Sequence, residues 1–260
     1  MPSPVLPFHP TRSPKGSAAA AWTPASVGST FVVNAPAAFS SRLYQDVAKT
    51  SLVTTAGQLV RAIVQEDGLT PDLTQSGATA AGYLTTTSSG LYAIGHDNID
   101  DREASAQTFV AGAKSAGVRF QYHTVLASSE LDVPLTLGAT PAQFRLAIGG
   151  PTATFPGVQF ICDVAGSSTS FTRFAWTPDA SEHTLLICYN GGSIGSAASY
   201  RAWLDGVEQT LSSGSSSTAS GTTSVGAISV GSAAAGIKIA RAFLAPSDLS
   251  AVQAAVHTWL

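Results

Sequence analysis

Short apolar runs, each ended by Gly, Pro, Ser or Asn, recur along most of this chain. They are rich in β-branched and aromatic residues and follow one another at intervals of roughly ten residues, the spacing of strands joined by tight turns. Examples are STFVVNA, GYLTTT, VRFQYHTVLA, GVQFICDVA, HTLLICYN and IKIARAFLA. About a dozen such runs, with no long helical patterns between them, predict an antiparallel sandwich or barrel and argue against a parallel sheet.

The charge content narrows the possible partners. Charged residues make up only 11% of the 260 residues, the net charge is -3, and Lys and Arg form no cluster. Binding to a phosphate backbone needs several clustered cations, so we expect no nucleic acid partner. No apolar run is long enough to span a membrane, and the opening residues lack the apolar centre of a secretory signal. We therefore expect a soluble product made in a cytoplasm, without membrane insertion.

Residues 1–25 differ in composition from the rest and are interpreted as a Pro/Ala-rich arm or linker, with a single domain over residues 26–260. Proline fixes φ and removes backbone donors, so the arm is not an ordinary sheet strand. It is either a disordered tail or an extended arm that docks on a neighbouring subunit. The prolines concerned are Pro2, Pro4, Pro7, Pro10, Pro14 and Pro24.

A helical pattern occurs only at the end of the chain, in APSDLSAVQAAVHTWL. Ser247 is a suitable N-cap, and helical spacing places Leu249, Val252, Val256 and Trp259 on one face. The Ser-rich segment 211–224 is predicted to be a flexible loop between strands.

Both cysteines, Cys162 and Cys188, lie in apolar strand-like runs. Buried free thiols are the default for such positions, and a disulfide between the two is the alternative. The five histidines are scattered, so the four-ligand spacing of a structural zinc site does not occur.

The C-terminal half has a characteristic order of features. A strand bearing His183 precedes SYRAWLDGVEQT, in which Asp205-Gly206 is a strong hairpin signal because Gly accepts φ > 0. A Gly-flanked strand, Gly226 to Gly231, follows, then a covering strand and a segment with Leu249-Ser250. This order resembles the concanavalin A-like, laminin G and pentraxin superfamily. The resemblance implies an all-β, antiparallel two-sheet β-sandwich, a concanavalin A-like jelly roll, closed by a short C-terminal helix.

A second resemblance concerns LYQDVAKTSLVTTAGQLVRAIVQEDG, which is similar to a segment of bacteriophage virion proteins that have this jelly-roll fold. The chain departs from that pattern at Leu52, where proline is usual, and at residues 65–68. From the residues alone, Asp46 is expected to cap a turn, residues 50–55 to have strand propensity, and Gly57 to permit a tight turn. The matching positions are Leu43, Tyr44, Gln45, Asp46, Val53, Thr54, Gly57 and Gln58.

The sequence contains no complete motif of a glucanase, a nucleophile elbow or a phosphate-binding loop. Glucanases of this fold use paired glutamates at alternating positions of one strand, and Glu130-Leu131-Asp132 is the only approximation. The second glutamate is missing, and Pro134 argues against a central strand there. Ser193 in GGSIG does not have the spacing of a nucleophile elbow, and no phosphate-binding loop occurs. We therefore expect a protein that is not an enzyme.

Two sets of residues are candidate ligand contacts. The segment GHDNIDDRE offers hard oxygens for calcium, although a solvated loop is the alternative because the spacing is not that of an EF-hand. Sugar rings stack on exposed aromatic residues, and Tyr92 and Trp176 lie nearest to predicted loops. The calcium candidates are Asp97, Asn98, Asp100, Asp101 and Glu103.

The leading hypothesis is a non-enzymatic structural protein of a phage or phage-like virion, a head decoration or a tail fibre or spike component, located in the virion. Other virion proteins, further copies of the chain and a host surface polysaccharide are the expected partners. The alternatives are a stand-alone carbohydrate-binding, lectin-like module with or without calcium and, third, a polysaccharide-degrading enzyme.

Overall fold

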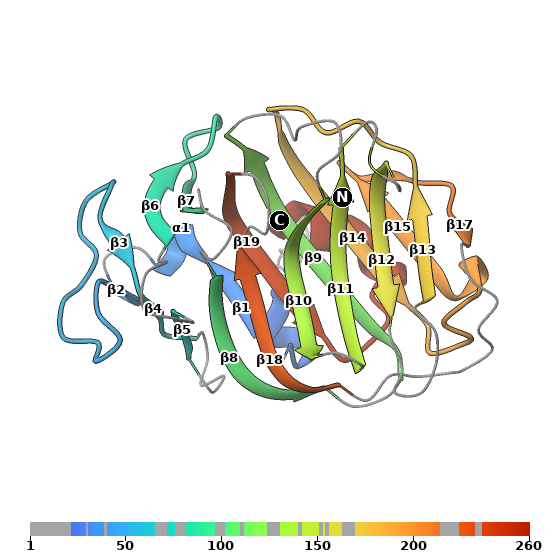
Figure 1. The fold of residues 1–260 in the computed structure, drawn as a ribbon, viewed down its shortest axis with the longest axis horizontal. Helices are drawn as coiled ribbons and strands as arrows, with labels where there is room; N and C mark the ends of the chain where they lie inside the picture. The colour runs from blue at the N-terminus through green and yellow to red at the C-terminus, as the bar shows by residue number, and fades with distance from the viewer. Residues whose placement is uncertain are drawn as a thin grey trace, which may run out of the picture.

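The computed structural model describes residues 22–29, 31–38, 41–65, 72–75, 82–96, 102–109, 112–123, 131–139, 142–150, 153, 156–162, 170–213, 224–231 and 236–260. Most of the predicted arm, the segment 97–101 and most of the predicted loop 211–224 lie outside these residues. Two antiparallel sheets stack face to face, which confirms the predicted all-β sandwich (Figure 1).

The first sheet is the one that carries the candidate site. Its strands in spatial order are β16 (Val207–Glu208), β15 (Tyr200–Leu204), β14 (Glu182–Tyr189), β9 (Lys114–Tyr122), β19 (Ile237–Ala245), β7 (Tyr92–His96), β6 (Gly82–Thr86) and β3 (Leu59–Val60), and β1 (Phe31–Asn34) also pairs with β19. β19, the last strand along the sequence among the described residues, therefore lies in the middle of this sheet, where it pairs with β9, β7 and β1.

The second sheet covers one face of the first. Its strands in spatial order are β17 (Ser212–Ser213), β13 (Ser170–Phe174), β12 (Gly157–Cys162), β11 (Ala142–Gly149), β10 (Leu131–Ala139), β18 (Ser224–Gly231), β8 (Arg102–Phe109), β5 (Leu73–Gln75), β4 (Ala62–Ile63) and β2 (Leu43–Tyr44). Neighbouring strands with consecutive numbers, such as β10 to β13, are joined as a meander.

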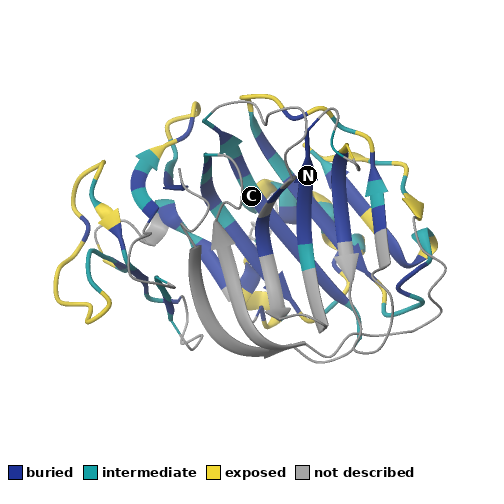
Figure 2. Cartoon of the chain, in the orientation of Figure 1, coloured by how far each residue is buried: buried dark blue, intermediate teal, exposed yellow. Residues whose placement is uncertain are grey.

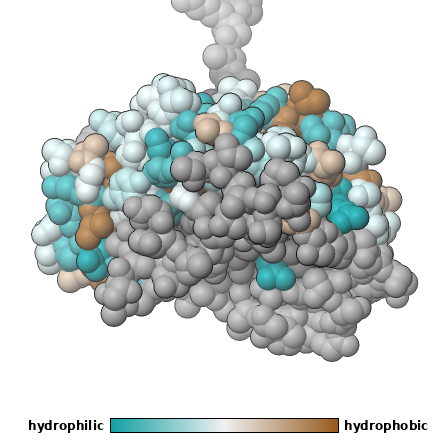
Figure 3. Space-filling model, turned by 45° about the horizontal axis from the view of Figure 1, so that its top comes forward, coloured by the Kyte–Doolittle hydropathy of each residue, from teal (hydrophilic) through white to brown (hydrophobic). Residues whose placement is uncertain are grey.

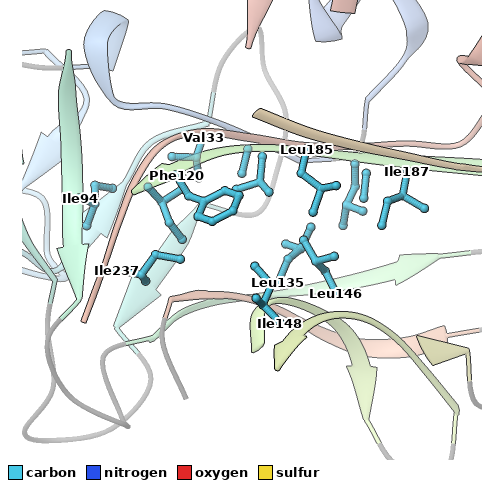
Figure 4. Close-up of a cluster of buried hydrophobic side chains, with 14 of the residues drawn as sticks. Val33, Ile94, Phe120, Leu135, Leu146, Ile148, Leu185, Ile187 and Ile237 are labelled. Carbon is cyan, nitrogen blue, oxygen red and sulfur yellow. The ribbon is translucent and has the colours of Figure 1, made fainter. Parts of the chain in front are cut away.

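The main core fills the space between the sheets, because side chains alternate across each strand. In β14, Leu185 and Ile187 point inward and are almost fully buried, while Leu186 and Cys188 belong to a separate cluster on the outer face. Figure 4 shows Leu185, Ile187 and Phe120 of the first sheet facing Leu135, Leu146 and Ile148 of the second. The first sheet is thus apolar on both faces.

A third layer covers the outer face of the first sheet. Trp22 lies 5.5 Å from Phe243 of β19 and 6.0 Å from Trp259 of helix α2 (Gln253–Trp259), measured between ring centroids. A 3₁₀ turn at Pro24–Val27 follows Trp22. Residues 22–25 of the predicted arm therefore pack on the sandwich, next to the C-terminal helix.

The C-terminal helix is confirmed, but its start and its buried face differ from the prediction. A 3₁₀ turn, Ser250–Val252, precedes α2, and the Asp248 side chain accepts a hydrogen bond from the Ser250 amide, so Ser247 is not the N-cap. The 3₁₀ turn shifts the helical phase, so that Val252 is 41% exposed while Leu260 is fully buried. Leu249 and Val256 are buried as predicted.

Pro134 lies in β10, between β11 and β18, so the expectation that it excludes a central strand was wrong. The pairing of β10 with β11 is irregular between Asp132 and Leu135, and a β-bulge is a position where proline is tolerated in a sheet. Asp132 is fully buried and accepts a hydrogen bond from the Tyr122 hydroxyl at 3.0 Å. It therefore lies in the core and not in an open cleft.

The two cysteines are not paired. Cys188 is buried and free, and burial raises the pKa of its thiol to about 12. Cys162 ends β12 in the other sheet, and its side chain lies outside the described structure. The buried-thiol interpretation is confirmed for Cys188.

Residues 41–65 and 72–75 form a lobe at one end of the sandwich, at the left of Figure 1. Within it, both Asp46 carboxylate oxygens accept hydrogen bonds from the Thr50 amide, and one of them also accepts from the Ser51 amide. Gln58 Oε1 accepts hydrogen bonds from two further amides, at 2.7 and 3.0 Å. The predicted cap at Asp46 is confirmed, whereas the predicted strand over residues 50–55 is reduced to a bridge at Leu52.

The exposed residues gather on this lobe and along the loops, while the strands of the sandwich are mostly buried (Figure 2). On the coloured part of the face in Figure 3, hydrophobic residues form separate small spots among polar ones. Among the described residues, no helix is long and apolar enough to cross a membrane. The remaining short helix, α1 (Ala35–Ala38), follows β1.

Candidate functional site

An open depression with a volume of about 470 Å³ lies at the start of β14, on the first sheet. Four parts of the chain meet there: the turn between β6 and β7, the strands β9 and β14, and the turn that follows β15. We call this depression the rim pocket. It is lined by Ser88, Ser89, Arg119, Glu182, His183, Thr184 and Asp205.

Asp205 is held in the pocket by the turn that the sequence predicts. Asp205 and Gly206 both have positive φ, 51° and 77°, as a two-residue type I′ hairpin requires. The turn places Asp205 beside the start of β14, where Oδ1 accepts a hydrogen bond from the Thr184 amide at 2.8 Å. The Asp205 amide donates in return to the Thr184 carbonyl at 2.8 Å, so the turn is fastened to β14 from both sides.

His183 lies between two carboxylates. Its Nδ1 is 2.7 Å from Asp205 Oδ2, and its Nε2 is 3.0 Å from Asp179 Oδ1. The ring faces the interior, where its centroid is 4.9 Å from the Trp176 ring and 6.0 Å from the Phe120 ring. Burial works against the protonated form, but the hydrogen bonds to Asp205 and Asp179 outweigh it and raise the pKa of His183.

Arg119 and Glu182 form an ion pair on the outward side of the same strands. Arg119 Nε is 2.5 Å from Glu182 Oε1, and a second guanidinium nitrogen donates to the Leu260 carbonyl at 2.9 Å. The Ser89 amide donates to Glu182 Oε2 at 3.1 Å. Burial opposes ionisation of Glu182, but the hydrogen bonds from Ser89, Arg119 and Thr87 lower its pKa.

Helix α2 contacts the lining residue Thr184 without lining the pocket itself. Its His257 has Nδ1 3.1 Å from the Thr184 hydroxyl, and burial lowers the pKa of His257. The lining of the pocket is therefore held by strands and a tight turn, and His257 of the helix contacts the Thr184 hydroxyl. Such fixed polar groups bind a ligand without first having to become ordered.

The charged groups of the site differ in their access to solvent. The side chains of Asp179 and Asp205 are 53% and 47% exposed, whereas those of Glu182 and His183 are 10% exposed. Among the charged residues that line the pocket, Asp205 is therefore the most exposed, and it lies in the same depression as the exposed Ser88 and Ser89. Oxygen acceptors and hydroxyls on a rigid rim are suited to hydrogen bonding with a polyhydroxylated ligand.

The aromatic residues predicted as glycan contacts are both half-buried and pack against the core. Trp176 touches the site indirectly, through its edge contact with His183, and its centroid is 6.2 Å from that of Phe120. Tyr92 begins β7, on the other side of the Ser88-Ser89 turn from β6. Neither residue lines the rim pocket.

The predicted calcium ligands lie almost wholly outside the described structure. Asp97, Asn98, Asp100 and Asp101 are not described, and Glu103 is placed only by its backbone in β8, paired with Val230 and Gln75. Among the described residues, no group of three or more His, Cys, Asp and Glu side chains is arranged to hold a metal ion. The calcium site stays a prediction.

Sequence reasoning missed most of the rim pocket. His183 and Asp205 were identified as markers of the fold, and the Asp-Gly turn was the signal that could have marked Asp205 as a candidate ligand. Arg119 and Glu182 come from strands whose pairing, Thr184 opposite Arg119, is set by the sheet register. No local motif indicates that register.

The fold and its pairing order place the chain in the class of concanavalin A-like β-sandwiches, as the sequence predicts. No protein-family model matches the chain, and no curated protein sequence is similar to it. Its solved neighbours are therefore found through structure alone.

The receptor-binding domains of botulinum neurotoxins are among the similar structures. The binding domain of neurotoxin DC in complex with SialylT has a TM-score of 0.56 and 9% identity, over 77% of this chain and 50% of that one. The same domain in complex with rat synaptotagmin II has a TM-score of 0.55 and 9% identity, over 86% and 51%. Neurotoxin type C, whose cell entry depends on two ganglioside molecules, has a TM-score of 0.55 and 9% identity, over 76% and 50%. This chain spans about half the length of these structures, and what it shares with them is the fold.

Proposed function

We propose that this chain is a non-enzymatic carbohydrate-binding module and that the rim pocket is its glycan contact. The observation that carries the proposal is the pocket itself, an open depression of about 470 Å³ whose polar groups are fixed by two strands and a type I′ turn. The similar neurotoxin structures include one in complex with SialylT and one whose cell entry depends on gangliosides, which supports a glycan as the ligand.

The chemistry of the pocket supports a sugar over an apolar ligand. Sugars present rows of hydroxyls that both donate and accept, and Asp205, Ser88 and Thr184 offer acceptors and hydroxyls in one depression. The pocket is open to solvent, so a ligand end is bound while the rest of a chain extends away. Among its lining residues, no apolar side chain is present to hold a hydrophobic ligand.

A glycan array with purified protein tests the proposal. Ser88 is exposed, lines the pocket and donates to Gln121 only through its backbone amide, so Ser88→Phe fills the pocket without removing that bond. The matched control is Ser41→Phe, at an exposed serine in the lobe. We expect Ser88→Phe to abolish glycan binding and Ser41→Phe to leave it unchanged. If no glycan binds the unaltered chain, the proposal is wrong.

The same array run with calcium and with a chelator tests the predicted calcium ligands between Asp97 and Glu103. We propose calcium as a partner of that segment alone, because no group of three or more His, Cys, Asp and Glu side chains among the described residues, the rim pocket included, is arranged to hold a metal ion. Binding that is lost with the chelator supports the calcium site. Equal binding in both conditions removes calcium from the function.

A structural role in a phage or phage-like virion is the second candidate, and residues 43–58 are the feature that favours it. Gln45, Asp46 and Gln58 of the virion-type pattern each hold the lobe together through a hydrogen bond to the backbone. We propose that the chain acts there as a homo-oligomer in contact with other virion proteins. Imaging of assembled particles with a labelled chain tests this role, and particles without label would exclude it.

The absence of catalysis is also a proposal. Of the approximate glucanase motif, Asp132 is buried in the core and bonded to Tyr122. Incubation of the protein with each glycan that it binds, followed by a reducing-sugar assay, is expected to release nothing. Release that depends on time and on protein concentration would instead support the polysaccharide-degrading alternative.

A further inference from the structure

His183 connects two segments of the chain, one that lines the rim pocket and one that adjoins it. Its Nδ1 is 2.7 Å from Asp205 Oδ2, in the turn that lines the pocket, and its Nε2 is 3.0 Å from Asp179 Oδ1, in the segment before β14. An ionised carboxylate only accepts hydrogen bonds, so each ring nitrogen must carry a hydrogen to bond its partner. Both bonds therefore exist together only when the imidazole is protonated.

The other groups packed around His183 do not titrate together with it. Two of them are the aromatic rings of Trp176 and Phe120, which carry no ionisable group. The charged and titratable groups on the adjoining strands and helix are Arg119, Glu182 and His257. The first two pair with each other, and the third contacts the Thr184 hydroxyl. The pKa values of the second and third are lowered, so both titrate below the range in which His183 does.

The two carboxylates differ in what else holds them. Asp205 is also bonded to β14 through Thr184, whose amide donates to Oδ1 and whose carbonyl accepts from the Asp205 amide, both at 2.8 Å. Asp179 has its other hydrogen bond within its own segment, from the Ser181 amide at 2.6 Å. A neutral ring that keeps its hydrogen on Nδ1 directs the Nε2 lone pair at Asp179, so that two acceptors face each other. Asp179 is therefore the carboxylate whose bond depends on the proton.

The segment that contains Asp179 also supports one side of the rim pocket. The carbonyl of the next residue, Ala180, accepts a hydrogen bond from Gln121 Nε2 at 2.8 Å. The same side chain accepts the Ser88 amide at its Oε1, again at 2.8 Å, and Ser88 lines the pocket. Gln121 thus joins the turn between β6 and β7 to the neighbour of Asp179, and a shift of that neighbour frees the amide group that holds Ser88.

We infer that the proton on His183 keeps the rim pocket in its binding form, and that glycan binding weakens as the pH rises and this proton is lost. The inference rests on the proposed carbohydrate-binding function and adds its regulation. His183 and Asp179 are then positioning residues, which act through the loop and the turn. The raised pKa of His183 places the change above the ordinary value for histidine, about 6.5. A site that binds only in its protonated form loses up to about tenfold in affinity for each pH unit above that pKa.

The protonation of His183 is measured without any ligand, from the nitrogen chemical shifts of isotope-labelled histidine side chains in the full chain. Between about pH 5.5 and about pH 9 we expect Nδ1 to keep the shift of an N–H nitrogen, while Nε2 changes from that shift to the shift of a nitrogen with a lone pair. A His183 ring that is already neutral at about pH 5.5, or that loses the hydrogen on Nδ1, overturns the inference whether or not a glycan binds.

Binding is measured on an array of neutral glycans, which do not titrate themselves, read at about pH 6 and at about pH 9. We expect the unaltered protein to lose about tenfold or more in affinity between the two. In Asp179→Asn the side-chain amide can donate to the neutral Nε2 of His183, while its oxygen still accepts the Ser181 amide. This variant should therefore bind at both pH values, with a difference of less than about twofold.

Glu208→Gln is the matched control, because this carboxylate is 49% exposed but pairs with Arg201 outside the rim pocket. It should lose as much affinity at high pH as the unaltered protein. Asp179 is 53% exposed, so its replacement leaves the core intact. Equal affinity of the unaltered protein at both pH values, or the same loss in Asp179→Asn, overturns the inference and leaves the carbohydrate-binding function in place. An array without binding at either pH overturns that function, while the titration of His183 is still read.

Discussion

Replacement of Asp205 by alanine is expected to lower the free energy of unfolding by about 2.5–4.5 kcal/mol, through three separable effects. The Thr184 amide loses its acceptor at 2.8 Å, which costs about 1–1.5 kcal/mol. Alanine at φ 51° is strained by about 1–2 kcal/mol, whereas aspartate and asparagine tolerate that region. The ion pair with His183 has a half-exposed partner and contributes about 0.5–1 kcal/mol.

Two further variants separate these effects. Asp205→Asn keeps an acceptor and the tolerance for positive φ, so it should lose only the ion pair, about 0.5–1 kcal/mol. Asp205→Gly removes the acceptor but has no strain, so it should fall between asparagine and alanine. Urea unfolding followed by circular dichroism measures all four proteins.

The pH dependence identifies the ion pair. The folded-state pKa of His183 is raised, so the stability that it contributes is fully present below its unfolded value, about 6.5, and is lost as the pH rises through the raised value. The difference in the free energy of unfolding between the unaltered protein and Asp205→Asn should therefore be larger at about pH 5.5 than at about pH 9. The difference in the free energy of unfolding between Asp205→Asn and Asp205→Ala should be the same at both pH values. An asparagine variant as unstable as the alanine variant would refute this reasoning.

Three other predictions concern the core, the free thiol and the lobe. A Cβ at Gly117 would overlap the ring of Phe243, which Trp22 and Trp259 hold from the other side, so Gly117→Ala should lower the free energy of unfolding by about 1–3 kcal/mol, measured by thermal denaturation. An unchanged melting temperature would mean that the ring has room to move. Cys188, with its pKa at about 12, should not react with a thiol reagent at about pH 8 until urea unfolds the chain, and rapid labelling of folded protein would contradict its burial. Asp46→Ala should speed hydrogen exchange at the amides of residues 50 and 51 but not in β14, because only the former lose an acceptor.

The sequence is a good guide to the fold because strands and turns are encoded locally. The Asp205-Gly206 turn, the strands beside it and the cap at Asp46 all follow from residue types within a few positions of one another. Pro134 shows where local reasoning fails, since whether proline is tolerated depends on a bulge that forms only against β11. Local reasoning is also incomplete for helix α2. The pattern predicts a helix that buries Val252, but the 3₁₀ turn before the helix leaves Val252 exposed.

The candidate site is less predictable because it is assembled across the sheet. Arg119 and Glu182 are far apart in the chain, and the register of β9 against β14 brings them together. His183 and Asp205 carry a visible signal, yet that signal indicates the fold as much as a site. The pattern in residues 43–58 is likewise explained by hydrogen bonds within the lobe. A matching sequence there therefore indicates a shared local structure more directly than a shared location of the protein.

The central position of β19 has a consequence for synthesis. β1 leaves the ribosome about 200 residues before its partner, residues 241–244 of β19. β9 and β7 also pair with β19, so their pairing is incomplete until β19 is synthesised. The first sheet therefore cannot close until β19 has been synthesised, and until then its unpaired strand edges stay open to other chains. A nascent chain of this protein should depend on chaperones that shield such edges, even though the finished sandwich buries them.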